Sequence, residues 1–466
     1  MLQTPADFAA NQASASAPRL FYGRFVHNTD LENLEYVNNG IIFIDEAGKI
    51  LETHKDATEE KLAELQQQHG LSEENVVRLG DKQFLMPGLV DTHIHAPQYV
   101  FTGSGMDLQL LEWLETYTFP RESAFKSVEY AKVAYRDVVS QLLRNGTTTA
   151  CYYGTIHLEA CKVLANIVDE LGQRAYVGKV NMDRNSPDYY IETTDDSVEK
   201  TEEFIKYMLE MNKANPRVYP VLTPRFVPSC SGELMRQLGD LARKYDIPIQ
   251  SHLCENKGEI EWVKHLHPEL PSYTAVYDHY GLLTDKTIMA HCVHLTQEER
   301  ELIKEKKAGI SHCAKSNFAL RSGVCNVRQL LEEDQKVGMG TDVSGGYAIS
   351  MFDAIRTSAI ASQTVSFTEK RADGSAYEHL KLAELLHLAT LGGAKVMGLE
   401  DRIGNFVVGK QFDALLIDPS APESNFHVYS HDDIYTTFEK FIYVGDDRNI
   451  RKVYVDGRVV DNKDTA

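Results

Sequence analysis

Eight short apolar runs, separated by segments with helical spacing, constrain the fold of this chain more than any other feature. Regular alternation of apolar strands with helices is typical of βαβ units and of a parallel sheet. Eight such units close a (β/α)₈ barrel of the TIM type, whose functional site lies at the carboxyl ends of the strands. We expect the barrel strands within residues 89–96, 147–154, 174–181, 218–226, 247–254, 287–295, 308–314 and 336–343.

The two ends of the chain carry a different pattern. From Arg19 to about Met86, and again from about Arg402, short β-rich pieces are punctuated by turns. A charged helical segment that Gly70 would end interrupts the first stretch. We therefore predict that both ends build one small β-sandwich-like domain beside an α/β barrel, with residues 1–85 and 401–466 in the small domain and residues 86–400 in the barrel.

Charge and composition narrow the class of protein. The chain has 48 lysines and arginines against 68 aspartates and glutamates, and its net charge of −20 repels phosphate backbones and anionic lipids. Its start lacks a secretory signal, and no run approaches the roughly eighteen apolar residues of a membrane span. Seven scattered cysteines without a C-x-x-C pair indicate neither a disulfide framework nor a cysteine zinc site. We expect a cytoplasmic protein that binds no nucleic acid polymer and no membrane.

Ionisable side chains stand repeatedly where the barrel runs end. His93 and His95 end the first run, His252 the fifth, His291 the sixth and Asp342 the eighth. Because side chains alternate along a strand, His93 and His95 point the same way and can share one ion. Imidazole and carboxylate ligands suit zinc or iron, so the set predicts a metal site at the barrel mouth. A buried core histidine would explain one member, but not all five.

Glu255 follows His252 by three residues, just beyond the predicted strand end. A water activated by a metal needs a carboxylate to take its proton and pass it to the substrate, and Glu255 is placed for that role. Away from the histidine it would be a solvated loop residue. His294 and His312 stand on or beside barrel strands, and whether they contact the site is open. The histidines expected at the surface are His54, His69, His265, His267 and His279.

Several motifs taken together resemble the guanine deaminase branch of the amidohydrolases: FLMPGLVDTHIHAPQ, IQSHLCEN, MAHCVHL, SHCAKSN and GMGTDVSGGY. The resemblance spans nearly the whole chain. PGLVDTHIH is typical of the superfamily, and HAPQ, LLEWLETYTFP, TPRF and TDVSGGY are typical of the guanine branch. The resemblance implies hydrolysis of guanine to xanthine and ammonia by a protein that is commonly a homodimer. The other zinc deaminase design does not apply, because the sequence has no P-C-x-x-C motif.

The resemblance also implies roles for site residues. Glu255, His291 and Asp342 are the expected catalytic residues, with Glu255 carrying a proton to ring nitrogen 3 and Asp342 assisting the water. Binuclear relatives use a lysine at the end of the fourth strand, where this sequence reads VYPVLTPRF, so one metal is favoured. Whether His291 also binds the metal stays open. The single zinc ion would be held by His93, His95, His252 and Asp342.

The choice of guanine depends on a few further residues. The guanidinium fork of Arg225 can meet oxygen 6 and nitrogen 7 of guanine, and before the resemblance is considered a salt bridge is an equal alternative. Gln98 can read the purine edge or be a polar loop residue, and Phe226 can stack on the ring or pack in the core. The resemblance favours substrate contact for Arg225 and Gln98. The predicted substrate site comprises Gln98, Arg225, Phe226, His95 and His252.

Two rival functions remain. An amidohydrolase acting on an aminopyrimidine, a triazine or an adenosine-like ring would share the metal set, and Arg225 and Gln98 distinguish it. A non-catalytic scaffold with this fold would be plausible if a ligand residue were replaced, and none is.

Residues 106–123 directly follow the first barrel strand. Leu108, Leu111 and Leu114 are expected on one helical face, with Asp107 and Glu115 turned elsewhere. The segment can cover the site and exclude water, or it can pack as an interface helix. The sequence leaves both roles open.

Overall fold

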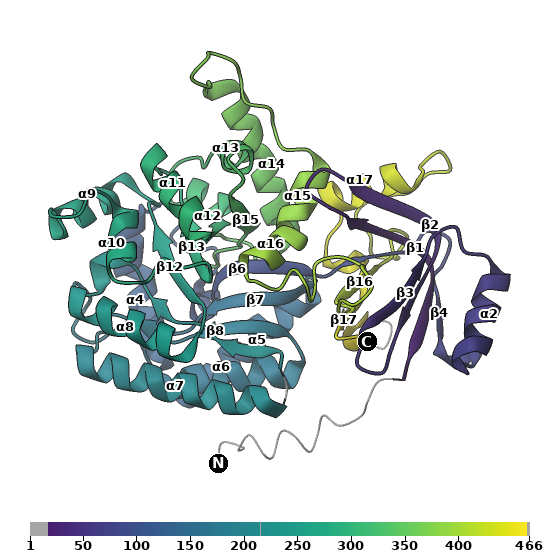
Figure 1. Cartoon of the computed structure of the whole chain (residues 1–466), viewed down its shortest axis with the longest axis horizontal. Helices are drawn as coiled ribbons and strands as arrows, with labels where there is room; N and C mark the ends of the chain where they lie inside the picture. Colours follow the sequence, from purple (N-terminus) through teal and green to yellow (C-terminus); the bar gives the residue numbers. More distant parts are fainter. Residues whose placement is uncertain (1–16, 215, 464–466) are drawn as a thin grey trace.

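The computed structural model describes residues 17–214 and 216–463 (Figure 1). Residues 1–16 and 464–466 lie outside the described residues. They include most of the N-terminal segment expected to lack a targeting signal and the outermost parts of the two expected terminal segments. Within the described residues, no helix combines the length and the apolar composition that crossing a bilayer requires.

Each of the eight predicted runs contains barrel strands, paired in parallel. Backbone hydrogen bonds close the ring: the N–H of Leu222 donates to Pro248 over 2.9 Å, and that of Asp342 donates to His93 over 2.9 Å. The predicted α/β barrel is confirmed. Its strands are β6 (Leu89–His95), β7 (Thr147–Tyr153), β8 (Arg174–Gly178), β9 (Val180–Asn181), β10 (Val218–Pro220), β11 (Thr223–Pro224), β12 (Ile249–Leu253), β13 (Thr287–His291), β14 (Gly309–His312) and β15 (Lys336–Met339).

Helices surround the barrel strands (Figure 1). The helix over Val128–Arg144 shows how the sequence sets the ends of such a helix: the Ser127 side chain caps its first turn, and Gly146 has a positive φ of 84°, which stops the helix. The barrel helices are α5 (Val128–Arg144), α6 (Leu158–Leu171), α7 (Thr194–Ala214), α8 (Gly232–Tyr245), α9 (Lys257–Leu266), α10 (Tyr273–His279), α11 (Gln297–Lys306), α12 (Ala314–Ala319), α13 (Val327–Glu332), α14 (Met351–Thr368), α15 (Leu382–Ala389) and α16 (Leu391–Val396).

Strands from both chain ends form one mixed sheet in the order β18-β17-β16-β5-β1-β2-β3, with β4 paired to β1. Phe21 of β1 contacts Tyr454 of β17 although these strands are not neighbours in that order. The sheet therefore curls around its own apolar face, which is sandwich-like packing. Its elements are β1 (Arg19–Asn28), β2 (Leu34–Ile44), β3 (Ile50–His54), β4 (Val76–Arg78), β5 (Phe84–Pro87), β16 (Ala414–Ile417), β17 (Ile450–Val455) and β18 (Arg458–Asn462), with helices α2 (Glu59–His69) and α17 (Ile434–Val444).

A buried ion cluster joins the small sheet to the barrel. Arg174, the first residue of β8, pairs with Asp413 over 3.0 Å and with Asp456 over 2.5 Å. Because β8 begins there, this junction lies at the amino end of a barrel strand. The carboxyl ends of the strands, where a barrel carries its site, are left for the loops that follow them.

Candidate active site

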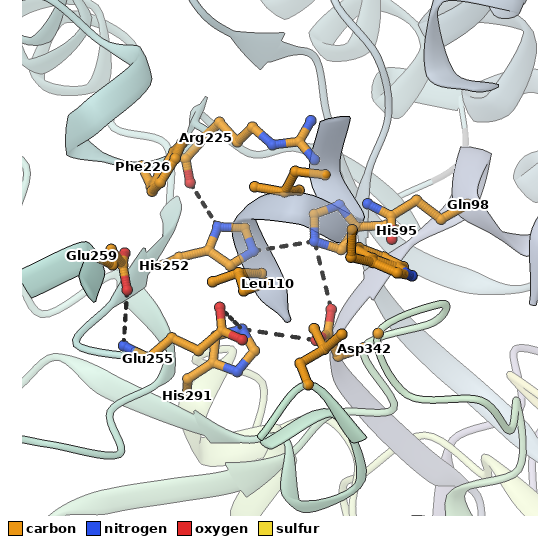
Figure 2. Close-up of a pocket in the computed structure, with 14 residues that line it drawn as sticks. His95, Gln98, Leu110, Arg225, Phe226, His252, Glu255, Glu259, His291 and Asp342 are labelled. Atoms are coloured by element: carbon orange, nitrogen blue, oxygen red, sulfur yellow. Dashed lines mark hydrogen bonds and ion pairs between the residues drawn. The ribbon is translucent and has the colours of Figure 1, made fainter. Parts of the chain in front are cut away.

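A pocket opens at the carboxyl ends of the barrel strands (Figure 2). Most of the residues singled out in the sequence converge on it. Arg225 lies on one side of the His95–His252 pair in Figure 2, and Glu255 and His291 lie on the other. The lining residues are His95, Gln98, Leu110, Trp113, Leu114, Arg225, Phe226, His252, Glu255, Glu259, His291, Leu320, Asp342 and Gly345.

The four predicted metal-binding residues form a compact, buried cluster. The Nε2 atoms of His95 and His252 are 3.1 Å apart, and Asp342 Oδ1 lies 3.1 Å from His93 Nε2 and 3.6 Å from His95 Nε2. Two overlapping groups, His93–His95–His252 and His93–His291–Asp342, each bring their ligand atoms within 4.8 Å of one another. Imidazoles with one carboxylate, gathered this closely, suit a divalent metal ion.

Hydrogen bonds to the far side of two rings turn their Nε2 atoms toward this cluster. Nδ1 of His252 donates to the backbone carbonyl of Arg225 over 2.6 Å, and Nδ1 of His291 donates to Oδ1 of Asn317 over 3.0 Å. The buried Nε2 atoms of His93 and His291 lie against carboxylates, at 3.1 Å from Asp342 Oδ1 and 3.4 Å from Glu255 Oε2 respectively. A ring held through one nitrogen presents the other as a ligand, so this arrangement is compatible with a bound divalent cation.

Backbone strain accompanies the cluster. His291 and Asp342 have φ of 71° and 47°, and Cys254, which follows β12, has φ of 49°. Residues other than glycine adopt this left-handed region at a cost of about 1 kcal/mol or more, and such strain concentrates at functional sites. The strand ends are therefore held in conformations that aim these side chains rather than in relaxed ones.

Burial and neighbouring charges shift the pKa values in opposite directions. Burial lowers the pKa of His95 and His252 well below the ordinary histidine value, so both rings are neutral and able to bind a metal. Burial by itself would raise the pKa of Asp342, but the neighbouring His93 and the other histidines outweigh this effect and hold the pKa of that carboxyl low. Burial raises the pKa of Glu255 to about 7.

Glu255 stands over the cluster with its carboxylate oriented by two contacts. Oε1 accepts a hydrogen bond from the Ser322 hydroxyl over 3.1 Å, and Oε2 lies 3.4 Å from Nε2 of His291. The N–H of Glu255 donates to Oε2 of Glu259 over 3.1 Å, which fixes the backbone behind it. A carboxylate with a raised pKa in reach of the metal-binding rings can both accept and release a proton near neutral pH.

Arg225 follows β11 and forms the salt bridge that the sequence offered as the alternative to substrate contact. Its Nη1 and Nη2 donate to Glu122 over 2.6 and 3.2 Å. Arg225 still lines the pocket. The two readings are thus compatible, because a guanidinium has five N–H groups and one carboxylate engages only two of them.

Gln98 and Phe226 also line the pocket. The Gln98 amide donates from Nε2 to Glu122 over 2.9 Å and accepts from the N–H of Ser344 over 3.1 Å. Phe226 is buried, and its ring meets the Trp262 ring edge-on at 6.3 Å. One wall of the pocket therefore carries fixed polar groups beside an aromatic surface.

The helical face predicted for residues 106–123 is wrong. Helix α3 spans only Leu110–Trp113 and continues through a wider turn at Leu114–Thr118 into α4 (Phe119–Ser123), so Leu108 precedes the helix. Leu111 is 41% exposed. Leu110, Trp113 and Leu114 face the pocket instead. Of the three expected leucines, Leu114 alone lies in the pocket lining, because Leu108 precedes the helix and Leu111 is on its exposed side.

The remaining histidines stay outside the pocket. Nε2 of His294 donates to the carbonyl of Ser322 over 2.7 Å, and His312 is buried behind the site. His267 is buried beside Arg184 rather than exposed, so its predicted surface position is wrong. Sequence reasoning missed Glu259, although the spacing N-x-x-E at residues 256–259 is a capping-box signal, and it missed Glu122, for which no local signal exists.

The chain matches the Amidohydrolase family over residues 84–460. It is 48% identical over 450 residues to the guanine deaminase of Dictyostelium discoideum, with 95% of this chain and 98% of the relative covered. The guanine deaminase of Homo sapiens is 46% identical over 447 residues, with 95% and 96% covered.

A solved structure of guanine deaminase from C. acetobutylicum, with guanine bound in its active site, has a TM-score of 0.85 and 37% identity, and the match covers 95% of this chain and 99% of that one. Sequence and structure thus agree over nearly the full length of both chains. The chain belongs to the amidohydrolase family.

Proposed function

We propose that this protein hydrolyses guanine to xanthine and ammonia. One observation carries the proposal: a single pocket brings together a buried cluster of metal-binding rings, the carboxylate of Glu255 and the donor wall of Arg225 and Gln98. The histidine cluster and Glu255 can carry out a hydrolysis. The N–H groups of Arg225 and Gln98 can pair with the adjacent acceptors, O6 and N7, of a 6-oxopurine. Relatives named guanine deaminase, 46–48% identical over 95% of this chain, support the same substrate.

We infer that the ion is one zinc per chain. The donor set of three imidazoles and one carboxylate, His93, His95, His252 and Asp342, is a zinc set. A second metal would need a further bridging ligand at the end of the fourth strand, where the chain carries Arg225 and Phe226. When bound, zinc acts as a Lewis acid that lowers the pKa of a coordinated water to about 7.

The protein residues then carry the proton and orient the ring. Glu255 accepts a proton from the attacking water and delivers it to N3 of guanine, while Asp342 and His291 hold the water in place. The water oxygen bonds to C2, which then carries a hydroxyl and the 2-amino group. The proton of that hydroxyl, the second proton of the water, passes to the amino nitrogen, the C2–N bond breaks, and ammonia leaves xanthine with a C2 carbonyl. Leu110, Trp113 and Leu114 exclude bulk water from this wall of the pocket, which strengthens the charges within it.

A direct assay tests the proposal. Purified protein is incubated with guanine, xanthine is followed by absorbance, and ammonia is measured in the same samples. We expect the two products in equal amounts. Guanine left unchanged by metal-loaded, folded protein would refute the proposed function.

Replacing Arg225 with alanine is expected to reduce recognition of guanine. A good bidentate contact contributes about 1–3 kcal/mol, so kcat/KM for guanine should fall about 5- to 150-fold. 2-Aminopurine, which lacks oxygen 6, should lose much less. We call the ratio of kcat/KM for guanine to kcat/KM for 2-aminopurine the guanine preference, and it should approach unity. If both substrates decline equally while zinc stays bound, Arg225 is a structural residue only.

The proposal includes a cytoplasmic location and a homodimer. All seven cysteines are free and buried, which suits a reducing compartment. Helix α14 projects from the body (Figure 1) with Ile360 57% and Phe367 71% exposed. Exposed apolar residues on a projecting helix suit contact with a second copy of the chain.

A further inference from the structure

Glu122, on α4, is a fully buried carboxylate surrounded by donors. Its Oε2 accepts from Arg225 Nη1 over 2.6 Å and from the Tyr190 hydroxyl over 2.8 Å. Its Oε1 accepts from Gln98 Nε2 over 2.9 Å and from Arg225 Nη2 over 3.2 Å. A carboxylate accepts about four hydrogen bonds, so these donors saturate it. Glu122 is also absent from the residues that line the pocket, and any effect it has on a ligand must pass through Arg225 and Gln98.

Helix α4 holds the Arg225 guanidinium from two directions. Glu122 engages one edge of the group, and the ring of Phe119 lies over its face, with 5.3 Å from Cζ to the ring centroid. The hydrogen bonds to Glu122 fix the position of the guanidinium, and the contact with the Phe119 ring fixes the orientation of its plane. The Nε–H and the second hydrogen of Nη2 then form the fork that remains for two adjacent acceptors on a ligand.

Glu122 also determines which way the Gln98 amide faces. Oxygen and nitrogen of a glutamine amide can exchange places, and a ligand would then meet a donor where it needs an acceptor. Here Nε2 is bound to Glu122, and Oε1 accepts from the N–H of Ser344 over 3.1 Å. We call the side of the pocket formed by Arg225 and Gln98 the recognition wall. The carboxylate of Glu122 therefore fixes the orientation of both of its polar groups.

We propose that Glu122 is a positioning residue that sets selectivity for guanine by fixing the Arg225 fork and the Gln98 amide. This inference rests on the proposed function. It gives residues 106–123 a second role besides lining the pocket: their last helix carries the residue that orders the recognition wall. The buried charge of Arg225 needs a partner in any case, so the test must separate positioning from simple support of the fold.

The decisive variant is Glu122→Gln, which keeps the shape but sets an NH₂ group against donors. We expect the guanine preference to fall about fivefold or more, in the range for a lost bidentate contact, mainly through KM for guanine. Zinc content and the unfolding temperature are measured alongside. In the Arg225→Ala background the same substitution should change the guanine preference little, because residues acting as one unit are not additive.

A matched control is Glu259→Gln, which replaces a second buried carboxylate, one that does line the pocket. Glu259 contacts the backbone of Glu255 and not Arg225, so both substrates should decline together and the guanine preference should stay unchanged. If Glu122→Gln fails to fold, Tyr190→Phe removes one hydrogen bond to Glu122 and keeps the ion pair. It should lower the guanine preference about twofold or more, the usual effect of one lost hydrogen bond.

The outcomes separate the two claims. An unaltered protein that leaves guanine intact refutes the proposed function. An active protein whose guanine preference is unchanged in both Glu122→Gln and Tyr190→Phe, or changes equally in Glu259→Gln, overturns the positioning role of Glu122 alone.

Discussion

Glu255→Gln is expected to abolish turnover of guanine while leaving metal content and fold nearly unchanged. Glutamine keeps the size of the side chain and its contact with Ser322, but an amide does not accept a proton from water or pass one to N3. Groups of this kind contribute about 10²- to 10⁴-fold to a rate. Steady-state kinetics with guanine measure the loss.

Two controls accompany this variant. Zinc per chain and circular dichroism should match those of the unaltered protein, because Glu255 is outside the proposed ligand set. A variant that keeps more than about a tenth of the original rate contradicts the proton-shuttle role, because a loss of less than about tenfold is smaller than the contribution such groups make.

Removing the metal is expected to eliminate activity and to lower the unfolding temperature. The purified protein should contain about one zinc per chain. A chelator strong enough to extract the zinc leaves three imidazoles and one carboxylate packed together without a cation. Because an ion that binds only the folded state stabilises that state, its removal lowers the unfolding temperature. Activity should return as one equivalent of zinc is added.

The measurement pairs elemental analysis with kinetics and thermal unfolding on the same samples. A matched sample treated with chelator already saturated with zinc controls for other effects of the chelator. Two tightly held metals per chain, or full activity after complete extraction, would contradict the mononuclear site.

The barrel could be predicted from the sequence because its signals are local. Each strand is a short apolar run, and its neighbours along the chain are also its neighbours in space. Because the carboxyl ends of all barrel strands lie at the same mouth of the barrel, the ionisable residues at those ends were expected to lie close together. The structure brings His93, His95, His252, His291 and Asp342 together there.

Other features depend on contacts between distant residues or on exact helix boundaries. Arg225 and Glu122 are separated by 103 residues, and nothing near either one in the sequence indicates the other. The apolar face of residues 106–123 was misplaced because the helix begins at Leu110 and then widens, which shifts the angular position of each later residue. Helix starts without a capping side chain, as here at Gln109, leave no signal to read.

The most direct test of guanine recognition compares substrates on the unaltered protein. Ammonia release is measured for guanine, 2-aminopurine, adenosine, cytosine and melamine, with kcat/KM determined for each. We expect kcat/KM for guanine to exceed that for each of the other compounds by about tenfold or more, because among them only guanine pairs a 2-amino group with both acceptors for the Arg225 fork. A higher kcat/KM for any of the other rings would contradict it.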